Sequence, residues 1–358
     1  MAEKKRFVWV DIYKAICIIL VVVGHSTGAF NQYIYQFHMA AFFFISGYTS
    51  KIYEKNLEDV FISKFRTLIL PMLTMILAFL CLRAGKALVF DKIGFAVAAR
   101  YLVNGICSYI MSGSADYLLG AIWFLPVMFF AFLLSRILSR ATGNTWRFLA
   151  ASVLVYLAGY YLQRRGYRQP HGFDIALIVQ LFFALGVVLG QTDFFELLQK
   201  SRLRILLYIA APVWMYILRC IGGSTMDCPS RAYPNIVLTA LAPLGGIFFT
   251  YFLSRVLERC GSIVQKIFTE LGRSTLGILF LHFLFFRAAT LILIPFGITN
   301  GEDLHSFLLP ESAKQYPWAW ALYSFITLVC STVCWKLLLR IPKVGYLLGG
   351  KKQKQPIT

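Results

Sequence analysis

Charged residues are scarce in this sequence. Asp, Glu, Lys and Arg make up 14% of the 358 residues, whereas about a quarter is usual for a soluble domain. Hydrophobic residues reach 59%, aromatic residues reach 16%, and the mean hydropathy is +0.68. A soluble globule has too little interior to hide this much apolar surface, so lipid must be part of the solvent. The composition therefore excludes an ordinary soluble protein.

Acidic residues are scarcer than basic ones. The sequence contains 16 Asp and Glu and 35 Lys and Arg, which gives a net charge of +19. No basic domain stands apart from the apolar segments, which excludes nucleic acid as a partner. The eight cysteines include no CxxC pair and no Cys/His spacing suited to zinc, so no metal site is expected. No repeat, low-complexity tract or separate soluble domain is visible, so any chemistry must lie within the apolar segments.

Ten apolar stretches are long enough to cross a bilayer as helices, which takes about 20 residues each. They predict an all-α, polytopic integral membrane bundle with about ten transmembrane helices, formed by one domain (1–350) and followed by a basic cytoplasmic tail (351–358). The predicted spans are 8–28, 33–50, 67–83, 117–135, 148–162, 174–190, 203–219, 235–254, 275–297 and 318–339.

The placement of Lys and Arg predicts the orientation of these spans. Counting alternate loops from Lys4, Lys5 and Arg6, 23 of the 35 cations fall on one side and 10 on the other. Because cytoplasmic loops carry the excess of Lys and Arg, both termini are predicted to be cytoplasmic. The net charge is mainly a signal of orientation.

The first span holds three ionisable residues, which are costly in a membrane and by default indicate function. Asp11 and Lys14 are three apart and can pair on one helix face. Lys14 and His25 are eleven apart, about 16 Å along the axis, and return to nearly the same face. The alternative is a Lys14 side chain that snorkels to the interface and a His25 that caps the helix.

His38 lies one or two turns inside the outer end of the second span, and by depth it can approach His25. Two imidazoles at one level suggest proton transfer, because imidazole titrates near neutral pH. The alternative is that His38 only forms a hydrogen bond with a neighbouring helix. His282, about two turns from the cytoplasmic end of its span, is expected at a different depth and in a structural role.

Other polar positions have two interpretations each. Lys64 and Arg66 precede the third span and could hold phosphates, or they could simply follow the orientation rule. In the outer loop, Arg164, Arg165 and Arg168 break that rule. They indicate either tolerated loop charge or contact with lipid phosphate, or else an anionic-ligand site. Two cysteines of another outer loop, Cys220 and Cys228, could pair in an oxidising compartment.

Several ordered motifs carry a family resemblance over nearly the whole chain. They are Asp11…Lys14…Gly24-His25-Ser26, Phe37-His38-Met39…Phe43-Phe44-Ile45-Ser46-Gly47-Tyr48, Trp123-Phe124-Leu125-Pro126 and Leu271-Gly272-Arg273-Ser274…His282. The set resembles the membrane-bound acyltransferase-3 family, especially its fucose 4-O-acetylase-like branch.

The resemblance implies a ten-helix enzyme of the bacterial inner membrane. Such an enzyme moves an acyl group, usually acetyl, from cytoplasmic acyl-coenzyme A as co-substrate to a hydroxyl of a cell-surface or lipid-linked glycan. The family pattern of a basic residue, ten others and His is met by Lys14 and His25, which makes His25 the catalytic histidine and Lys14 a candidate for the coenzyme A end. The family's paired arginines before the third helix are met only partly, by Lys64 and Arg66 at a different spacing.

The chemistry of acyl transfer agrees with this assignment. A sugar hydroxyl is a weak nucleophile, so a neutral imidazole, His25, must take its proton during attack on the thioester. The developing oxyanion needs donors, for which Ser26, His38 and Tyr48 are candidates. Asp11, Trp123, Arg273 and His282 are expected to be structural.

Two alternatives remain. One is a transporter of polysaccharide or lipid-linked glycan, although the two halves show no similarity of the kind typical of transporters, and the Lys14 and His25 pair has no counterpart in the second half. The other is transfer of succinyl instead of acetyl, in which Arg164, Arg165 or Arg168 meets the extra carboxylate.

Overall fold

The computed structural model describes residues 7–26, 28, 30–90, 92, 94–113, 117–223, 225–233, 235–306 and 308–349. The predicted tail 351–358 and the cations Lys4, Lys5 and Arg6 lie outside the described residues. In the described part, helices follow one another with short turns, and the β-type pairing consists of one isolated bridge between Asp227 and Ala232. The predicted all-α class is confirmed.

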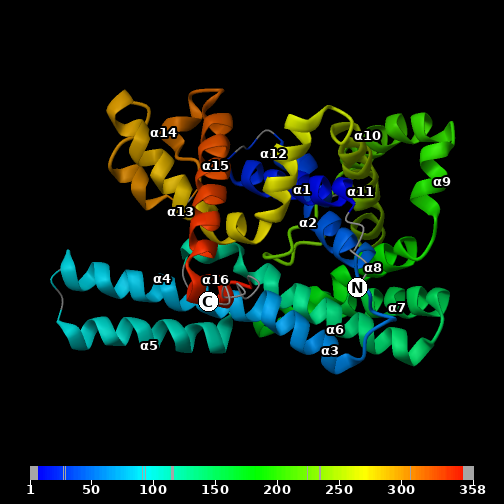
Figure 1. Ribbon diagram of the computed structural model, residues 1–358, viewed down its shortest axis with the longest axis horizontal. Coiled ribbons are helices and arrows are strands. Elements are labelled where there is room, and N and C mark those ends of the chain that lie inside the picture. Colours follow the sequence, from blue (N-terminus) through cyan, green and yellow to red (C-terminus); the bar gives the residue numbers. More distant parts are fainter. Residues whose placement is uncertain are drawn as a thin grey trace, which may run out of the picture.

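Sixteen α-helices are described (Figure 1). In chain order they are α1 (Val8–Ser26), α2 (Asn31–Tyr48), α3 (Leu57–Lys64), α4 (Leu70–Val89), α5 (Phe95–Ser112), α6 (Phe124–Thr142), α7 (Thr145–Arg164), α8 (Phe173–Gly190), α9 (Phe194–Lys200), α10 (Leu203–Ile221), α11 (Ile236–Leu257), α12 (Ser262–Arg273), α13 (Thr275–Leu293), α14 (Glu311–Lys314), α15 (Ala319–Arg340) and α16 (Pro342–Leu347). Shorter helical turns are η1 (Phe65–Ile69), η2 (Tyr117–Trp123), η3 (Pro170–Gly172), η4 (Ile294–Phe296) and η5 (Glu302–His305).

Eight helical segments of the described chain are long and apolar enough to cross a membrane. They comprise α1, α4 with the preceding α3, α6, α8, α10, α11, α13 and α15. The other two predicted spans, 33–50 and 148–162, coincide with the helices α2 and α7, which fall outside this set. Polar side chains lower the mean hydropathy of these two helices, for example Gln36 and His38 in α2 and Arg147 and Gln163 in α7. The polytopic membrane bundle is confirmed.

The start of α1 lies beside the ends of α11 and α15. The backbone N–H of Trp9 donates a hydrogen bond to the carboxylate of Glu258 at 3.2 Å. Helix α12 completes the connection, because its Glu270 pairs with Lys336 near the end of α15, while Arg273 lies 3.7 Å from Asp11. The first and last spans therefore have their chain-terminal ends on one face, as the predicted topology requires.

Helices α2 and α8 pack with their backbones in direct contact. A Cβ atom on Gly47 would lie 2.0 Å from the carbonyl oxygen of Phe183, and one on Gly186 would lie 2.0 Å from that of Phe44. Glycine at both positions lets the two backbones touch, which is how helices in membranes gain packing energy without a hydrophobic drive between them. This contact fixes the position of α2, which carries His38.

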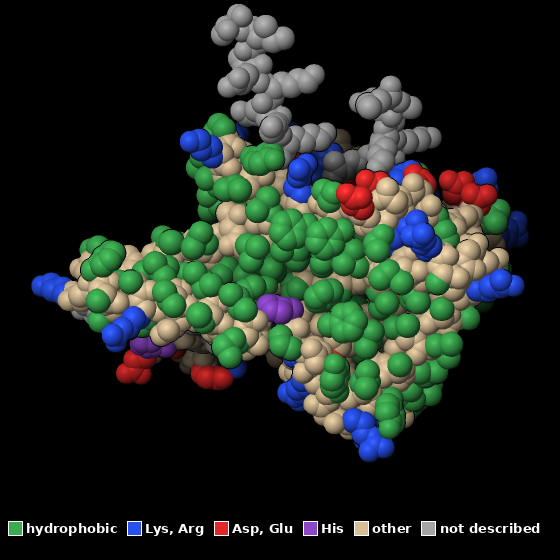
Figure 2. Space-filling model, turned by 90° about the horizontal axis from the view of Figure 1, so that it is seen from below, with side chains coloured by type: hydrophobic (Ala, Val, Ile, Leu, Met, Phe, Trp, Pro, Cys, Tyr) green, Lys and Arg blue, Asp and Glu red, His purple; other side chains and the backbone are tan. Residues whose placement is uncertain are grey.

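Helices α4 and α5 form an antiparallel hairpin that extends away from the other helices, at the left of Figure 1. The hydroxyl of Tyr109 on α5 donates to the sulfur of Met72 on α4 at 3.2 Å, near the base of the hairpin. Its apolar side chains are widely exposed, as with Phe90, Phe95 and Met111. Figure 2 shows that hydrophobic side chains cover much of one face of the molecule, with charged ones toward its margins. Such a surface suits contact with lipid.

The α2–α8 contact gives a test of the packing. Gly186→Ala should lower the free energy of unfolding by about 1–3 kcal/mol, because the added methyl group meets backbone that cannot rotate away. Thermal unfolding of the purified protein in detergent measures the change. The matched control is Gly85→Ala in α4, where a Cβ atom would meet nothing within 4 Å. Equal stability of the two variants would contradict the packing.

Candidate functional site

A cavity of about 330 Å³ lies between α1, α2, α13, the turn η2 before α6, and the outer loop around residue 228. His25, in the last turn of α1, and His38, on α2, both line it. The structure thus brings both histidines to one cavity, as their predicted depths allow. Ile18 also lines the cavity, which thus extends seven residues, about 10 Å, along α1 from His25 toward the start of that helix. We call this space the histidine cavity.

The sequence predicted that His282 lies at a different depth from His25, but the two rings lie side by side. The ring of His282 stacks on that of His25, with centroids 5.5 Å apart and planes inclined by 20°. The prediction was wrong because α12, which was taken as part of a cytoplasmic loop, packs along α1, with Gly272 against the carbonyl of Asp11. Thr275 then starts α13 inside the bundle and already lines the histidine cavity.

Hydrogen bonds to backbone fix the tautomers of two histidines. His38 Nδ1 lies 2.7 Å from the carbonyl oxygen of Ile34, and His282 Nδ1 lies 3.0 Å from that of Ile278. A carbonyl only accepts, so each Nδ1 carries the proton and each neutral ring keeps a lone pair on Nε2. Nε2 of His282 is buried and has no hydrogen-bond partner within the described residues. The stacked pair His25 and His282 thus has basic nitrogen inside the bundle.

The two other predicted oxyanion donors lie elsewhere. Ser26 is buried, donates to the carbonyl of Val23 and shares a 2.7 Å hydrogen bond with Ser324, so it joins α1 to α15. Tyr48 packs against Trp9 with ring centroids 5.2 Å apart, at the opposite end of α1 from His25. Because α1 and α2 are antiparallel, later residues of α2 lie near the start of α1. The structure therefore does not bring Tyr48 to His25.

The predicted cofactor-binding cations also separate. Lys64 lines a cavity of about 140 Å³ together with Lys51 and Lys55, and its ammonium lies 3.6 Å from the ring centroid of Phe132. We call this space the lysine cavity. Arg66 is exposed and does not line it, because residues two apart on a helix point to opposite sides. Lys14 lies one turn below Ile18, just beyond the inner end of the histidine cavity.

The predicted arginine cluster does not converge on one ligand. Arg164 lines an outer cavity of about 420 Å³ with Arg231 and Tyr233. Arg165 instead lies over the ring of Tyr161, 5.2 Å from its centroid, and Arg168 does not line that cavity. This outer cavity shares no lining residue with the histidine cavity.

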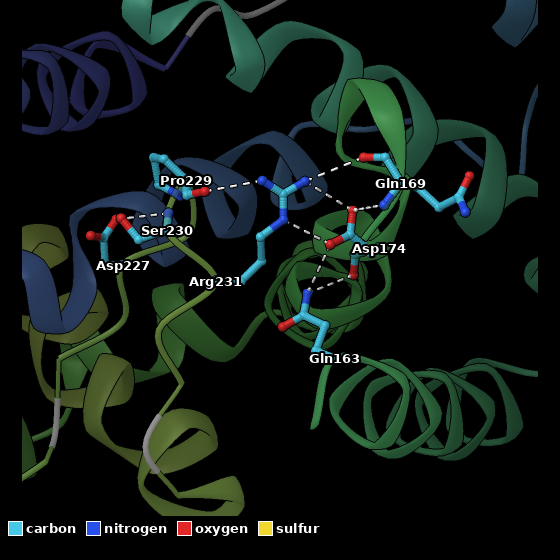
Figure 3. Close-up of polar contacts among 7 residues, drawn as sticks. All are labelled: Gln163, Gln169, Asp174, Asp227, Pro229, Ser230 and Arg231. Carbon is cyan, nitrogen blue, oxygen red and sulfur yellow. Dashed lines mark hydrogen bonds and ion pairs between the residues drawn. The ribbon is translucent and has the colours of Figure 1, made fainter. Parts of the chain in front are cut away.

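An ion pair that no sequence motif indicated holds the loop 225–233 (Figure 3). The guanidinium of Arg231 donates to both carboxylate oxygens of Asp174, at 2.9 and 3.3 Å, and also to the carbonyl of Gln169. Asp174 is 1% exposed and sits in the first turn of α8. An Asp at the edge of an apolar span was the available signal, because such a carboxylate needs a partner.

The loop 225–233 forms part of the wall of the histidine cavity. The N–H of Met226 donates to the carbonyl of Tyr35 at 2.8 Å, which attaches the loop to α2. Asp227 and Ser230 then line the cavity beside the two histidines. Cys228 is buried in the loop, which raises the pKa of its thiol to about 12. It does not pair with the exposed Cys220, and both thiols are free.

Trp123 lines two cavities of the site. It was expected to be structural, and it ends η2 directly before α6. Its side chain lines the histidine cavity and also a neighbouring cavity that contains His171. Asp11 and Arg273, the other two residues expected to be structural, lie 3.7 Å apart and join α1 to α12.

Comparison with known proteins gives one match. No curated protein and no solved structure matches the chain. A family model described as an acyltransferase domain, Acyl_transf_3, matches residues 7–336. The match includes every helix that lines the histidine cavity. The chain is thus a membrane acyl-transferring enzyme by family, and it belongs to the acyltransferase-3 family.

Proposed function

We propose that the protein is an O-acetyltransferase of the fucose 4-O-acetylase-like branch, in a bacterial inner membrane. It moves acetyl from cytoplasmic acetyl-coenzyme A to a hydroxyl of a cell-surface or lipid-linked glycan. The observation that carries the proposal is the position of His25. Its imidazole lies at the outer end of α1, in a cavity that extends toward the cytoplasmic face along that helix.

His25 is the general base of the proposed reaction. As the sugar hydroxyl attacks the thioester carbonyl, its proton passes to the neutral imidazole and a tetrahedral oxyanion forms. The carbon–sulfur bond then breaks, the ester remains on the sugar, and the imidazolium returns its proton to the departing thiolate. No external oxidant or metal is needed to balance the step. Of the predicted oxyanion donors, His38 is the one that lines this cavity; because the Ile34 carbonyl already takes its Nδ1 proton, His38 can donate to the oxyanion from Nε2 only as an imidazolium.

His282 becomes part of this proposal. Its ring is stacked on His25 and its Nδ1 is held by backbone carbonyls, so its orientation is fixed. A fixed ring at 5.5 Å restricts the rotation of His25. We therefore assign His282 the role of positioning His25 for proton transfer.

Residues of α2 and α6 that line the two cavities support a binding site for acetyl-coenzyme A along these helices. Phe42 of α2 lines the histidine cavity and Thr49 lines the lysine cavity. They are seven residues apart on one helix face, about 10 Å along the axis. On α6, Phe124 lines the histidine cavity and Phe132 lines the lysine cavity, eight residues further along the helix. A pantetheine arm is long enough to span this separation. The phosphates of coenzyme A would then lie among the lysines and the thioester near His25.

The acyl group is more consistent with acetyl than with succinyl. The wall of the histidine cavity contains no Arg or Lys among the described residues, while Asp227 brings a negative charge. A succinyl carboxylate there would lack a cation. Arg164, which was a candidate for that cation, lines a separate cavity and cannot supply it.

The role of His25 has a direct test. His25→Ala should abolish measurable transfer of radiolabelled acetyl from acetyl-coenzyme A to a panel of lipid-linked glycans, because general-base catalysis alone contributes about 10²–10⁴-fold. His305→Ala, a change at an exposed histidine outside the histidine cavity, is the matched control and should keep full activity. Thermal unfolding and membrane yield confirm that both variants fold. Retained transfer by His25→Ala would overturn the assignment.

The donor site has an independent test. Lys64→Met should raise KM for acetyl-coenzyme A by about tenfold with little change in kcat, since a charged hydrogen bond to phosphate contributes about 1.5–3 kcal/mol. The control is Arg66→Met, which removes a cation of the same segment that lies outside the lysine cavity. A larger effect of Arg66→Met than of Lys64→Met would contradict this donor site.

A further inference from the structure

A second cavity, of about 220 Å³, adjoins the histidine cavity. The two share Gly120, Trp123 and Pro229 in their walls. A ligand whose reacting hydroxyl is near His25 therefore has this space beside it, next to Gly120, Trp123 and Pro229. Neither the catalytic chemistry nor the donor route uses it. We call it the side cavity.

The side cavity combines aromatic rings with polar groups. The rings of Tyr109 and His171 meet edge to face on one side, with centroids 5.0 Å apart, and Trp123 adds an indole. The hydroxyl of Ser112 and the guanidinium of Arg231 supply polar atoms. A sugar ring presents apolar C–H faces that pack on aromatic rings, and hydroxyl groups at its edge that need hydrogen bonds. An acyl chain or a lipid tail would use only the rings.

The backbone around the side cavity is held in unusual conformations. Lys92, His171 and Arg231 are the non-glycine residues with positive φ in the described chain, and two of them, His171 (59°) and Arg231 (55°), line this cavity. Such conformations cost free energy, persist only where the surroundings hold them, and cluster at ligand sites.

Specific contacts hold these two residues. His171 Nε2 donates to the carbonyl of Ile110 at 3.2 Å, and Gly113 leaves room beside it, because a Cβ there would lie 2.9 Å from the backbone nitrogen of His171. Arg231 is held by its ion pair with the buried Asp174. The walls of the side cavity are therefore fixed in shape.

We propose that the side cavity is a second acceptor subsite, which binds the sugar ring adjacent to the one that is acylated. This inference rests on the proposed function and adds to it. The enzyme selects an acceptor of at least two linked sugars, with the neighbouring ring on Tyr109 and His171 and its hydroxyls toward Ser112 and Arg231.

The test compares pairs of acceptors that differ by one sugar. The purified enzyme is given radiolabelled acetyl-coenzyme A and alkyl glycosides of single hexoses and deoxyhexoses, each beside the matching disaccharides. For the best acceptor, kcat/KM should be at least about tenfold higher for the disaccharide, equivalent to about 1.4 kcal/mol.

Two variants locate this preference in the side cavity. Ser112→Trp fills the cavity from an exposed position, and Tyr109→Ala removes an aromatic wall. In both variants, the ratio of kcat/KM for the disaccharide to kcat/KM for the single sugar should fall toward one. The kcat/KM for the single sugar itself should stay unchanged. The matched control Tyr109→Phe keeps the ring, loses only the hydrogen bond to Met72, and should keep the preference.

The outcomes separate the two proposals. No preference in the wild-type enzyme, or an equal loss on both acceptors in Ser112→Trp, overturns the second subsite and leaves acetyl transfer standing. If no glycoside takes up label, the proposed function fails, and the subsite fails with it.

Discussion

The ion pair between Asp174 and Arg231 is the interaction on which the outer half of the structure depends. It joins the first turn of α8 to the loop 225–233, and this loop contributes to the walls of three outer cavities. A buried pair gives little net stability, since the desolvation of both charges offsets their attraction. Removing either partner is costly, however, because the other charge is left buried and unpaired. The pair therefore fixes the position of the loop more than it stabilises the fold.

Polar chemistry inside an apolar bundle is the second constraint. Each imidazole in the interior must satisfy at least one nitrogen locally, and His38 and His282 do so through carbonyls of their own helices. This arrangement leaves Nε2 unprotonated in both rings. The helices thus orient these rings without any carboxylate partner of the kind found in hydrolase triads.

Much of the fold follows from the sequence because long apolar runs have few structures available in lipid. Each of the ten predicted spans coincides largely with a helix, and counting turns allowed His25 and His38 to approach, which agrees with their place in one cavity. The depth of His282 could not be obtained in this way. It depends on how α12, a helix with polar residues, packs along α1. Arg231 and Asp174 are 57 residues apart, and no local pattern relates them.

The central claim is that one cavity accepts a donor from the cytoplasmic face and an acceptor from the outer face. Sided proteoliposomes test it most directly, with labelled acetyl-coenzyme A on the face that carries Glu270 and Lys336 and a glycan acceptor on the other. The account predicts labelled acceptor while coenzyme A stays on its own side. Labelling only when both substrates share one side, or passage of unmodified glycan across the membrane, would contradict it.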